Sequence, residues 1–198
     1  MIVVGIDGGM IRLGLAAVEI TEDSFDLVSY DLLSTPRGEG KYNAFLTEGI
    51  TKITNQFPRF LNNNRPDIIF SETIPAGKLG ANDSQVIAAV TTCHVLAVQW
   101  GIPWIDIAAS TVKKSLTDDG RATKTQVRNF VLDNYPELRE KHIQEKVSQK
   151  KEGLKKRPGL AQDYFDAVAV AIAGAMRVRS LIMELNDEEK ALQEVQKT

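Results

Sequence analysis

The stretch IVVGIDGG at residues 2–9 places one acid, Asp7, near the end of an otherwise apolar run that closes on two glycines. A short apolar run bounded in this way is typical of a buried β-strand. Glycines beside the acid would let a phosphate approach the backbone closely. A second run, DIIFSET at residues 67–73, ends with Glu72 at the kind of strand end where open α/β sheets bind ligands.

Two further acids open the apolar stretch QDYFDAVAVAIAGA at residues 162–175. Asp163 and Asp166 are three positions apart, so a helix would place both on one face. Burying several carboxylates in apolar elements is costly unless a cation neutralises them. Asp7, Glu72, Asp163 and Asp166 together therefore predict a divalent metal site.

Each acid also has an ordinary structural explanation. Asp7 could cap a tight turn, Glu72 could be a solvated strand-end residue, and the pair in the helix could simply complement the helix dipole. The strand and glycines around Asp7 would also suit the phosphate loop of an actin-like ATPase lobe. Such ATPases need two lobes around the nucleotide, and this chain has neither the length nor a second copy of the motif.

The apolar periodicity predicts an α/β domain with a mixed sheet sandwiched by helices. We expect strands at 2–7, 13–20 and 25–33, followed by a helix at 42–61 and a strand at 67–74. A helix from 83 or 84 to about 100, a strand at 103–108 and helical pieces from 110 and at 123–135 follow. The closing helix is expected at about 163–185.

Composition limits the class of protein. The 198 residues are 43% hydrophobic and 25% charged, which predicts one domain, 1–198, with one good core. Apolar runs are too short to span a membrane, and residues 1–7 have no basic leader. Cys93 is the only cysteine, which excludes an intrachain disulfide. We therefore expect an intracellular, cytoplasmic protein.

Five motifs together resemble the RuvC group of Holliday-junction resolvases, within the ribonuclease H-like nuclease superfamily. They are GIDGG at 5–9, SET at 71–73, VKK at 112–114, ATKTQV at 122–127 and DYFDAVAVAIA at 163–173. The resemblance implies a ribonuclease H-like fold, whose mixed five-stranded sheet has three antiparallel strands and then two parallel ones. It also implies that the four acids bind metal and that Lys113 and Lys124 contact phosphate.

The same resemblance implies a homodimeric endonuclease that cleaves four-way DNA junctions, with one active site for each crossing strand. Carboxylate ligands suit Mg²⁺, with Mn²⁺ as a substitute, and we expect two ions about 4 Å apart in each site. The products would carry 5′-phosphate and 3′-hydroxyl ends. A non-cleaving nucleic-acid-binding or interaction module on the same fold is the competing interpretation.

The chain departs from the family pattern in two places. Ile74 and Pro75 stand where family members place an aromatic wedge, so we expect weaker discrimination between four-way junctions, forks and flaps. A basic insertion at about 136–158 is interpreted either as a solvated loop or as a contact to the DNA backbone. The predicted DNA-binding residues are Lys78, Lys114, Lys150, Lys151, Lys155, Lys156 and Arg157. A helical tail at about 181–198 suits packing or subunit contact rather than DNA.

Overall fold

The computed structural model describes residues 1–35, 42–73, 83–140 and 160–195. Its five-stranded sheet has the order β3-β2-β1-β4-β5. The strands β1 (Ile2–Gly8), β2 (Arg12–Ile20) and β3 (Phe25–Ser34) are antiparallel neighbours. The strands β4 (Ile68–Glu72) and β5 (Trp104–Ile107) continue the sheet in parallel with β1. This topology confirms the predicted mixed sheet.

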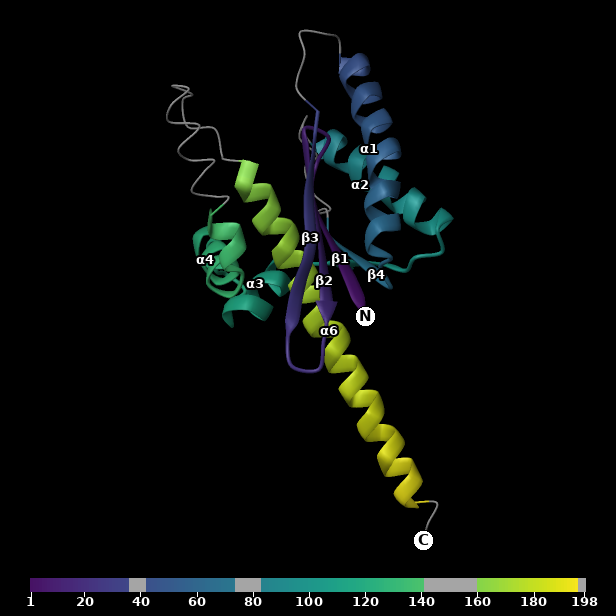
Figure 1. The fold of residues 1–198 in the computed structure, drawn as a ribbon, viewed down its shortest axis with the longest axis vertical. Coiled ribbons are helices and arrows are strands. Elements are labelled where there is room, and N and C mark those ends of the chain that lie inside the picture. Colours follow the sequence, from purple (N-terminus) through teal and green to yellow (C-terminus); the bar gives the residue numbers. More distant parts are fainter. Residues whose placement is uncertain (36–41, 74–82, 141–159, 196–198) are drawn as a thin grey trace.

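Helices cover both faces of the sheet (Figure 1). One face packs against α1 (Tyr42–Asn64) and α2 (Asp83–Gln99), and its core includes Val4 and Ile69. The other packs against α3 (Ala109–Thr117), α4 (Lys124–Asn134) and α6 (Leu160–Val195), and its core includes Val3 and Phe70. Adjacent residues of β1 and β4 thus enter different cores, because side chains alternate across a strand.

Close packing against glycine brings α6 onto the sheet. A Cβ atom at Gly5 of β1 would overlap the backbone of Ala167 and Ala171, and one at Gly14 of β2 would overlap the carbonyl of Asp163. Glycine therefore lets the start of α6 approach the middle of the sheet. This approach fixes where the acids of α6 lie relative to β1.

The helix α6 extends well beyond the sheet (Figure 1), and it is longer at both ends than the predicted 163–185. Part of the predicted tail is the continuation of this helix to Val195. Every side chain from 181 to 193 is exposed, including Leu185 at 63% and Leu192 at 65%. Residues 196–198 lie outside the described residues.

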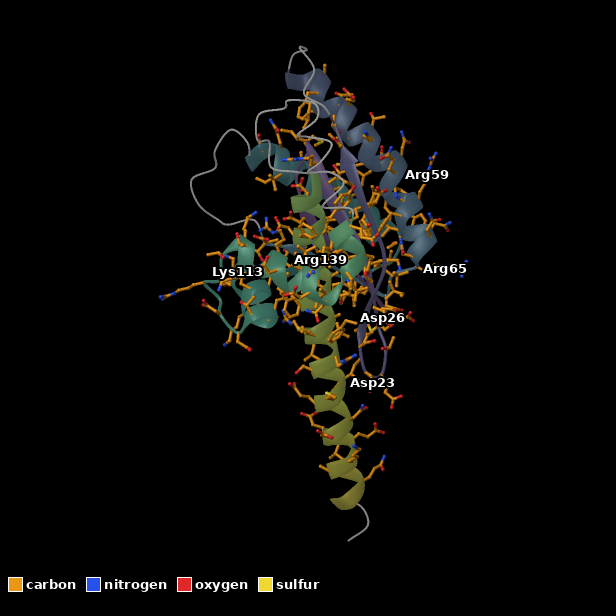
Figure 2. The ribbon with its side chains drawn as sticks, turned by 60° about the vertical axis from the view of Figure 1, so that its left-hand side comes forward. Asp23, Asp26, Arg59, Arg65, Lys113 and Arg139 are labelled. Atoms are coloured by element: carbon orange, nitrogen blue, oxygen red, sulfur yellow. The ribbon has the colours of Figure 1, made fainter. Side chains whose placement is uncertain are left out.

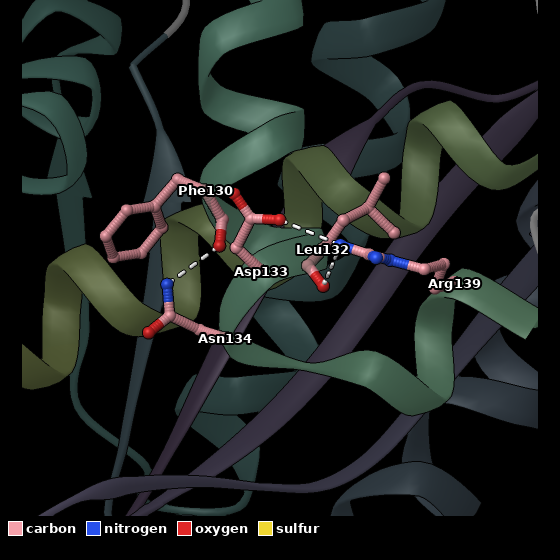
Figure 3. Close-up of polar contacts among 5 residues, drawn as sticks. All are labelled: Phe130, Leu132, Asp133, Asn134 and Arg139. Atoms are coloured by element: carbon pink, nitrogen blue, oxygen red, sulfur yellow. Dashed lines mark hydrogen bonds and ion pairs between the residues drawn. The ribbon is translucent and has the colours of Figure 1, made fainter.

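The first part of the predicted basic insertion belongs to the folded body. Residues 136–140 are helical, and Leu138 is buried at 2% exposure in the core beside α6. Arg139 donates to the Asp133 carboxylate at 2.8 Å, and Asn134 donates to the Phe130 carbonyl at 2.8 Å (Figure 3). Arg139 is thus already engaged with α4. The remainder of the insertion, 141–158, lies outside the described residues.

Within the described part of the chain, no helix combines the length and the apolarity that crossing a bilayer requires.

Candidate active site

The ends of β1 and β4 place Asp7 and Glu72 on the same side of the sheet. These strands are parallel, and the last pair in register, Ile6 with Ser71, immediately precedes the two acids. Gly5 and Phe70, two positions earlier on each strand, both face α6. Because side chains two apart on a strand share a face, Asp7 and Glu72 also point toward α6.

The helices α4 and α6 bring an acid and a lysine to the same place. Thr123 and Gln126 form a capping box at the start of α4, in which the Thr123 N–H donates to the Gln126 side chain at 2.8 Å. This cap fixes Lys124 as the first residue of the helix. The Lys124 ammonium lies 3.1 Å from Oδ2 of Asp166, whose side chain is only 15% exposed.

Five of the residues predicted from the motifs line one cavity of about 170 Å³, which we call the acidic cleft: Asp7, Glu72, Lys113, Lys124 and Asp166. Its apolar walls come from Ala109 and Val112 of α3, Val127 of α4 and Ala169 of α6. The cleft therefore gathers residues from two strands and three helices. Among the described residues, no three acids, histidines or cysteines are close enough to hold one ion as they stand.

Crowding of carboxylates makes the acidic cleft hard to ionise fully. Burial, followed by repulsion from Asp166 and Glu72, raises the pKa of Asp7 from 3.8 to about 8. Burial and the charge of Asp166 also raise the pKa of Glu72, against the opposing attraction of Lys124 and Lys113. Asp7 is thus protonated at neutral pH unless a further positive charge enters the cleft.

Lys124 supplies part of the missing positive charge. Burial alone would lower the pKa of Lys124, but the charge and hydrogen bond of Asp166, then Asp7 and Glu72, raise it overall. Lys124 therefore stays an ammonium group. The neighbouring lysines of α3 differ in position, since Lys113 lines the cleft and is half-buried, whereas Lys114 is exposed.

Asp163 is not among the residues that line the acidic cleft, although its charge still acts on Asp7. It lines an adjoining cavity of about 250 Å³ with Gly8, Gly9, Arg12 and the buried Gln85. Nε of Arg12 lies 3.0 Å from Oδ2 of Asp163. Burial raises the pKa of Asp163 and Arg12 opposes that shift. The motifs did not predict Arg12, because no spacing in the sequence links the start of β2 to a helix that begins 148 positions later.

Several predicted residues lie outside the described part of the chain. They are the positions of the missing wedge, Ile74 and Pro75, and the predicted DNA contacts Lys78, Lys150, Lys151, Lys155, Lys156 and Arg157.

Comparison with known protein families shows which family the chain belongs to. The model of the RuvC family, described as crossover junction endodeoxyribonuclease RuvC, matches residues 3–149. The chain belongs to the RuvC family of crossover junction endodeoxyribonucleases. The matched range contains Asp7, Glu72, Lys113 and Lys124 but ends before the acids of α6. The fold itself brings Asp166 to the matched residues.

Curated RuvC proteins are distant relatives of this chain. RuvC of Mycolicibacterium vanbaalenii is 27% identical over 135 residues, which cover 66% of this chain and 66% of that protein. RuvC of Ruminiclostridium cellulolyticum is 26% identical over 137 residues, which cover 66% of this chain and 76% of that protein. The match thus spans about two thirds of the RuvC relative from Mycolicibacterium.

Solved structures agree on the fold over a longer range. RuvC of Thermus thermophilus matches with a TM-score of 0.68 and 24% identity, over 91% of this chain and 96% of that one. The same protein in complex with a Holliday junction substrate gives a TM-score of 0.69 over the same shares. The yeast mitochondrial Holliday junction resolvase gives 0.58 at 15% identity, over 96% and 83%. These matches confirm the ribonuclease H-like fold predicted for this RuvC protein.

Proposed function

We propose that this RuvC protein resolves four-way DNA junctions by metal-dependent hydrolysis of phosphodiester bonds. The observation that carries the proposal is the acidic cleft, in which three carboxylates and two lysines from five elements surround one small cavity. Carboxylates suit divalent cations, and lysines suit the phosphate of a nucleic acid. The products would carry 5′-phosphate and 3′-hydroxyl ends.

The donor set of the cleft fits hard divalent cations such as Mg²⁺, with Mn²⁺ as a substitute. Asp7, Glu72 and Asp166 offer carboxylate oxygens, and their burial and mutual repulsion raise the pKa values of Asp7 and Glu72. A bound cation would relieve that repulsion. When bound, two such ions supply Lewis-acid stabilisation of the attacking water and of the leaving 3′ oxygen.

The residues of the cleft have distinct proposed roles. Asp7, the central acid, would hold both ions, with Asp166 serving the water side and Glu72 the leaving-group side. Asp163 would assist from the adjoining cavity. Lys124 and Lys113 would donate hydrogen bonds to the phosphate oxygens, whose negative charge grows in the transition state.

The distribution of charged side chains favours one face of the protein as the DNA-binding surface. Lys113 and the exposed Lys114 lie on α3 beside the cleft. Figure 2 shows Lys113 on this helix and Asp23 and Asp26 at the hairpin of β2 and β3. DNA would therefore dock over α3, with the basic insertion contributing further phosphate contacts. Because the substrate is DNA, we propose an intracellular site of action.

A homodimer would provide one cleft for each of two crossing strands. Exposed apolar side chains offer surfaces for pairing on α2, where Val95 is 52% and Val98 63% exposed, and on the outer half of α6. Sedimentation velocity with Val98→Asp and Leu185→Asp would decide between these surfaces. Only the variant that disrupts the real interface should sediment as a monomer.

The test of the proposed function is cleavage of a panel of labelled DNAs. Four-way junctions, forks, flaps and linear duplex are incubated with the protein and Mg²⁺, and the cuts are mapped on each strand. We expect metal-dependent cuts near the branch point of four-way junctions, with forks and flaps also cut because Ile74 and Pro75 replace the wedge. A preference of a hundredfold or more for four-way junctions would contradict the argument from those two residues.

Two variants separate cleavage from binding. Asp7→Asn should abolish cleavage and retain junction binding, because most affinity comes from phosphate contacts. Asp187→Asn, at an exposed position on α6, is the matched control and should behave like wild type. Tight junction binding without any Mg²⁺-dependent cut in the wild-type protein would support a non-cleaving binding module instead.

A further inference from the structure

The ion pair between Arg12 and Asp163 is partly shielded from water. Arg12 begins β2, where its carbonyl accepts a hydrogen bond of 2.8 Å from the N–H of Gly9. Its guanidinium Nε lies 3.0 Å from Oδ2 of Asp163, and the two side chains are 26% and 18% exposed. The pair thus joins the strand after Asp7 to the first turn of α6, at the border of the acidic cleft.

The geometry of this pair leaves Asp163 able to take another ligand. Oδ2 is buried, and it has no hydrogen-bond donor among the residues that the structure describes, so the contact with Arg12 is electrostatic only. A buried arginine and carboxylate usually form parallel hydrogen bonds, which hold them together more strongly. Arg12 therefore neutralises Asp163 without occupying the lone pairs of Oδ2.

Asp163 and the other acids line different cavities. Asp163 lines the cavity beside Gly8, Gly9 and Arg12, whereas Asp166, one turn later on α6, lines the acidic cleft. Residues three apart on a helix point about 60° apart around its axis. Asp163, in contact with Arg12, thus borders the adjoining cavity rather than the acidic cleft.

We propose that Arg12 is a positioning residue that controls when Asp163 joins the metal ligands. Asp7, Glu72 and Asp166 offer the carboxylates that already line the cleft, and Asp163 must leave Arg12 before the second ion to bind would gain its full set of ligands. Divalent cations therefore bind in two unequal steps, with the second weakened by Arg12. This inference rests on the proposed function of the acidic cleft as a metal site.

The alternative is that Arg12 merely ties β2 to α6. A purely structural tie would change the stability of the fold when removed, but it would leave the affinity for cations in the folded protein unchanged. A second difference concerns Asp163. If Arg12 acts through this carboxylate, its replacement should have no effect on cation binding once Asp163 is neutral.

The experiment measures Mn²⁺ binding to the full-length protein without DNA, by the electron paramagnetic resonance signal of free Mn²⁺. Wild type should bind in two steps, and Arg12→Gln should tighten the second step about tenfold, because Asp163 no longer has to leave a guanidinium; changes at partners of metal ligands alter metal affinity by about 10- to 100-fold. Asp163→Asn should weaken or remove that step, and Arg12→Gln combined with Asp163→Asn should match Asp163→Asn alone. Arg59→Gln, at an exposed position on α1, is the matched control.

The outcomes separate this inference from the metal site itself. If Asp7→Asn leaves Mn²⁺ binding unchanged, the acidic cleft is not the metal site and the proposed function fails. If Asp7→Asn abolishes binding but Arg12→Gln gives the wild-type isotherm, only the role of Arg12 is overturned. An effect of Arg12→Gln that persists beside Asp163→Asn, or a weaker second step in Arg12→Gln, also overturns it. Circular dichroism of each variant shows that the folded protein is being compared.

Discussion

Replacing Asp7 by Asn should stabilise the protein in the presence of a chelator. Burial and the neighbouring carboxylates raise the pKa of Asp7 from 3.8 to about 8 in the folded state. Between these pH values the folded protein holds a proton that the unfolded chain has released, so its free energy of unfolding falls as the pH rises. Asparagine resembles the protonated acid, so the variant should lack this part of the pH dependence.

The size of the effect follows from the pKa difference. A shift of about four units, at about 1.36 kcal/mol per unit, sets a ceiling of roughly 5 kcal/mol above pH 8. Water that enters the cleft and small side-chain movements reduce this cost, and we expect a gain of about 2 kcal/mol at pH 8. For a chain of this length, such a gain raises Tm by about 4 to 8 °C. The gain should vanish below about pH 3, where Asp7 is protonated in both states.

Urea denaturation followed by circular dichroism, in chelator at several pH values from 5 to 8, measures the difference. Asp187→Asn, whose side chain is 79% exposed in the wild type, is the control and should show no such pH dependence. Added Mg²⁺ should stabilise wild type but not Asp7→Asn, because a ligand stabilises only the state that binds it. An Asp7→Asn variant no more stable than wild type at pH 8, or a gain that does not grow with pH, would refute the reasoning.

Three further predictions test other parts of the molecule. Lys124→Ala and Lys113→Ala should each lower the single-turnover cleavage rate roughly a hundredfold, because each removes a hydrogen-bond donor to the transition state. Junction affinity should change less, and wild-type cleavage rates in both variants would exclude the proposed role. Ending the chain after Ser180 should change the free energy of unfolding by no more than about 0.5 kcal/mol, because the side chains of 181–193 are exposed. A larger decrease, measured by urea denaturation, would mean that residues 181–193 pack against the rest of the protein. Four lysines of the basic insertion are replaced together by Gln in the last test: Lys150, Lys151, Lys155 and Lys156. The dependence of DNA affinity on salt should flatten by about 0.9 log-log units for each phosphate that is no longer neutralised, whereas an unchanged slope would leave the insertion as a solvated loop.

Much of the fold could be predicted because its strands and helices have clear hydrophobic patterns. The runs around Asp7 and Glu72 are buried strands, and their apolar residues enter both cores, as expected for strands covered on two faces. The ends of α6 were less predictable. Its last turns are exposed on all sides, so burial does not determine where the helix ends, and local preference decides instead.

The placement of the site residues could be predicted only in part. Asp7, Glu72, Asp166, Lys113 and Lys124, which the motifs singled out, line one cavity, because strand ends and helix starts meet at one edge of such a sheet. The motifs did not indicate that Asp163 and Asp166 line different cavities. Asp163 pairs with Arg12, a residue of β2 that is distant in sequence, and Gly14 on the same strand permits close packing of β2 against the start of α6.

The charges around the site explain why the same acid governs both stability and metal binding. Among the described residues, three positive side chains, Arg12, Lys113 and Lys124, and four acids line the two cavities, so the acids exceed the cations by one charge when all four are ionised. Burial, followed by repulsion from Asp166 and Glu72, raises the pKa of Asp7, so this acid is the one that takes up a proton. A divalent cation can bind at Asp7 only by replacing that proton, since metal ligands must be deprotonated. Proton and metal therefore compete for the carboxylate of Asp7. The same competition links the lower stability expected for the metal-free protein at alkaline pH to its proposed binding of metal.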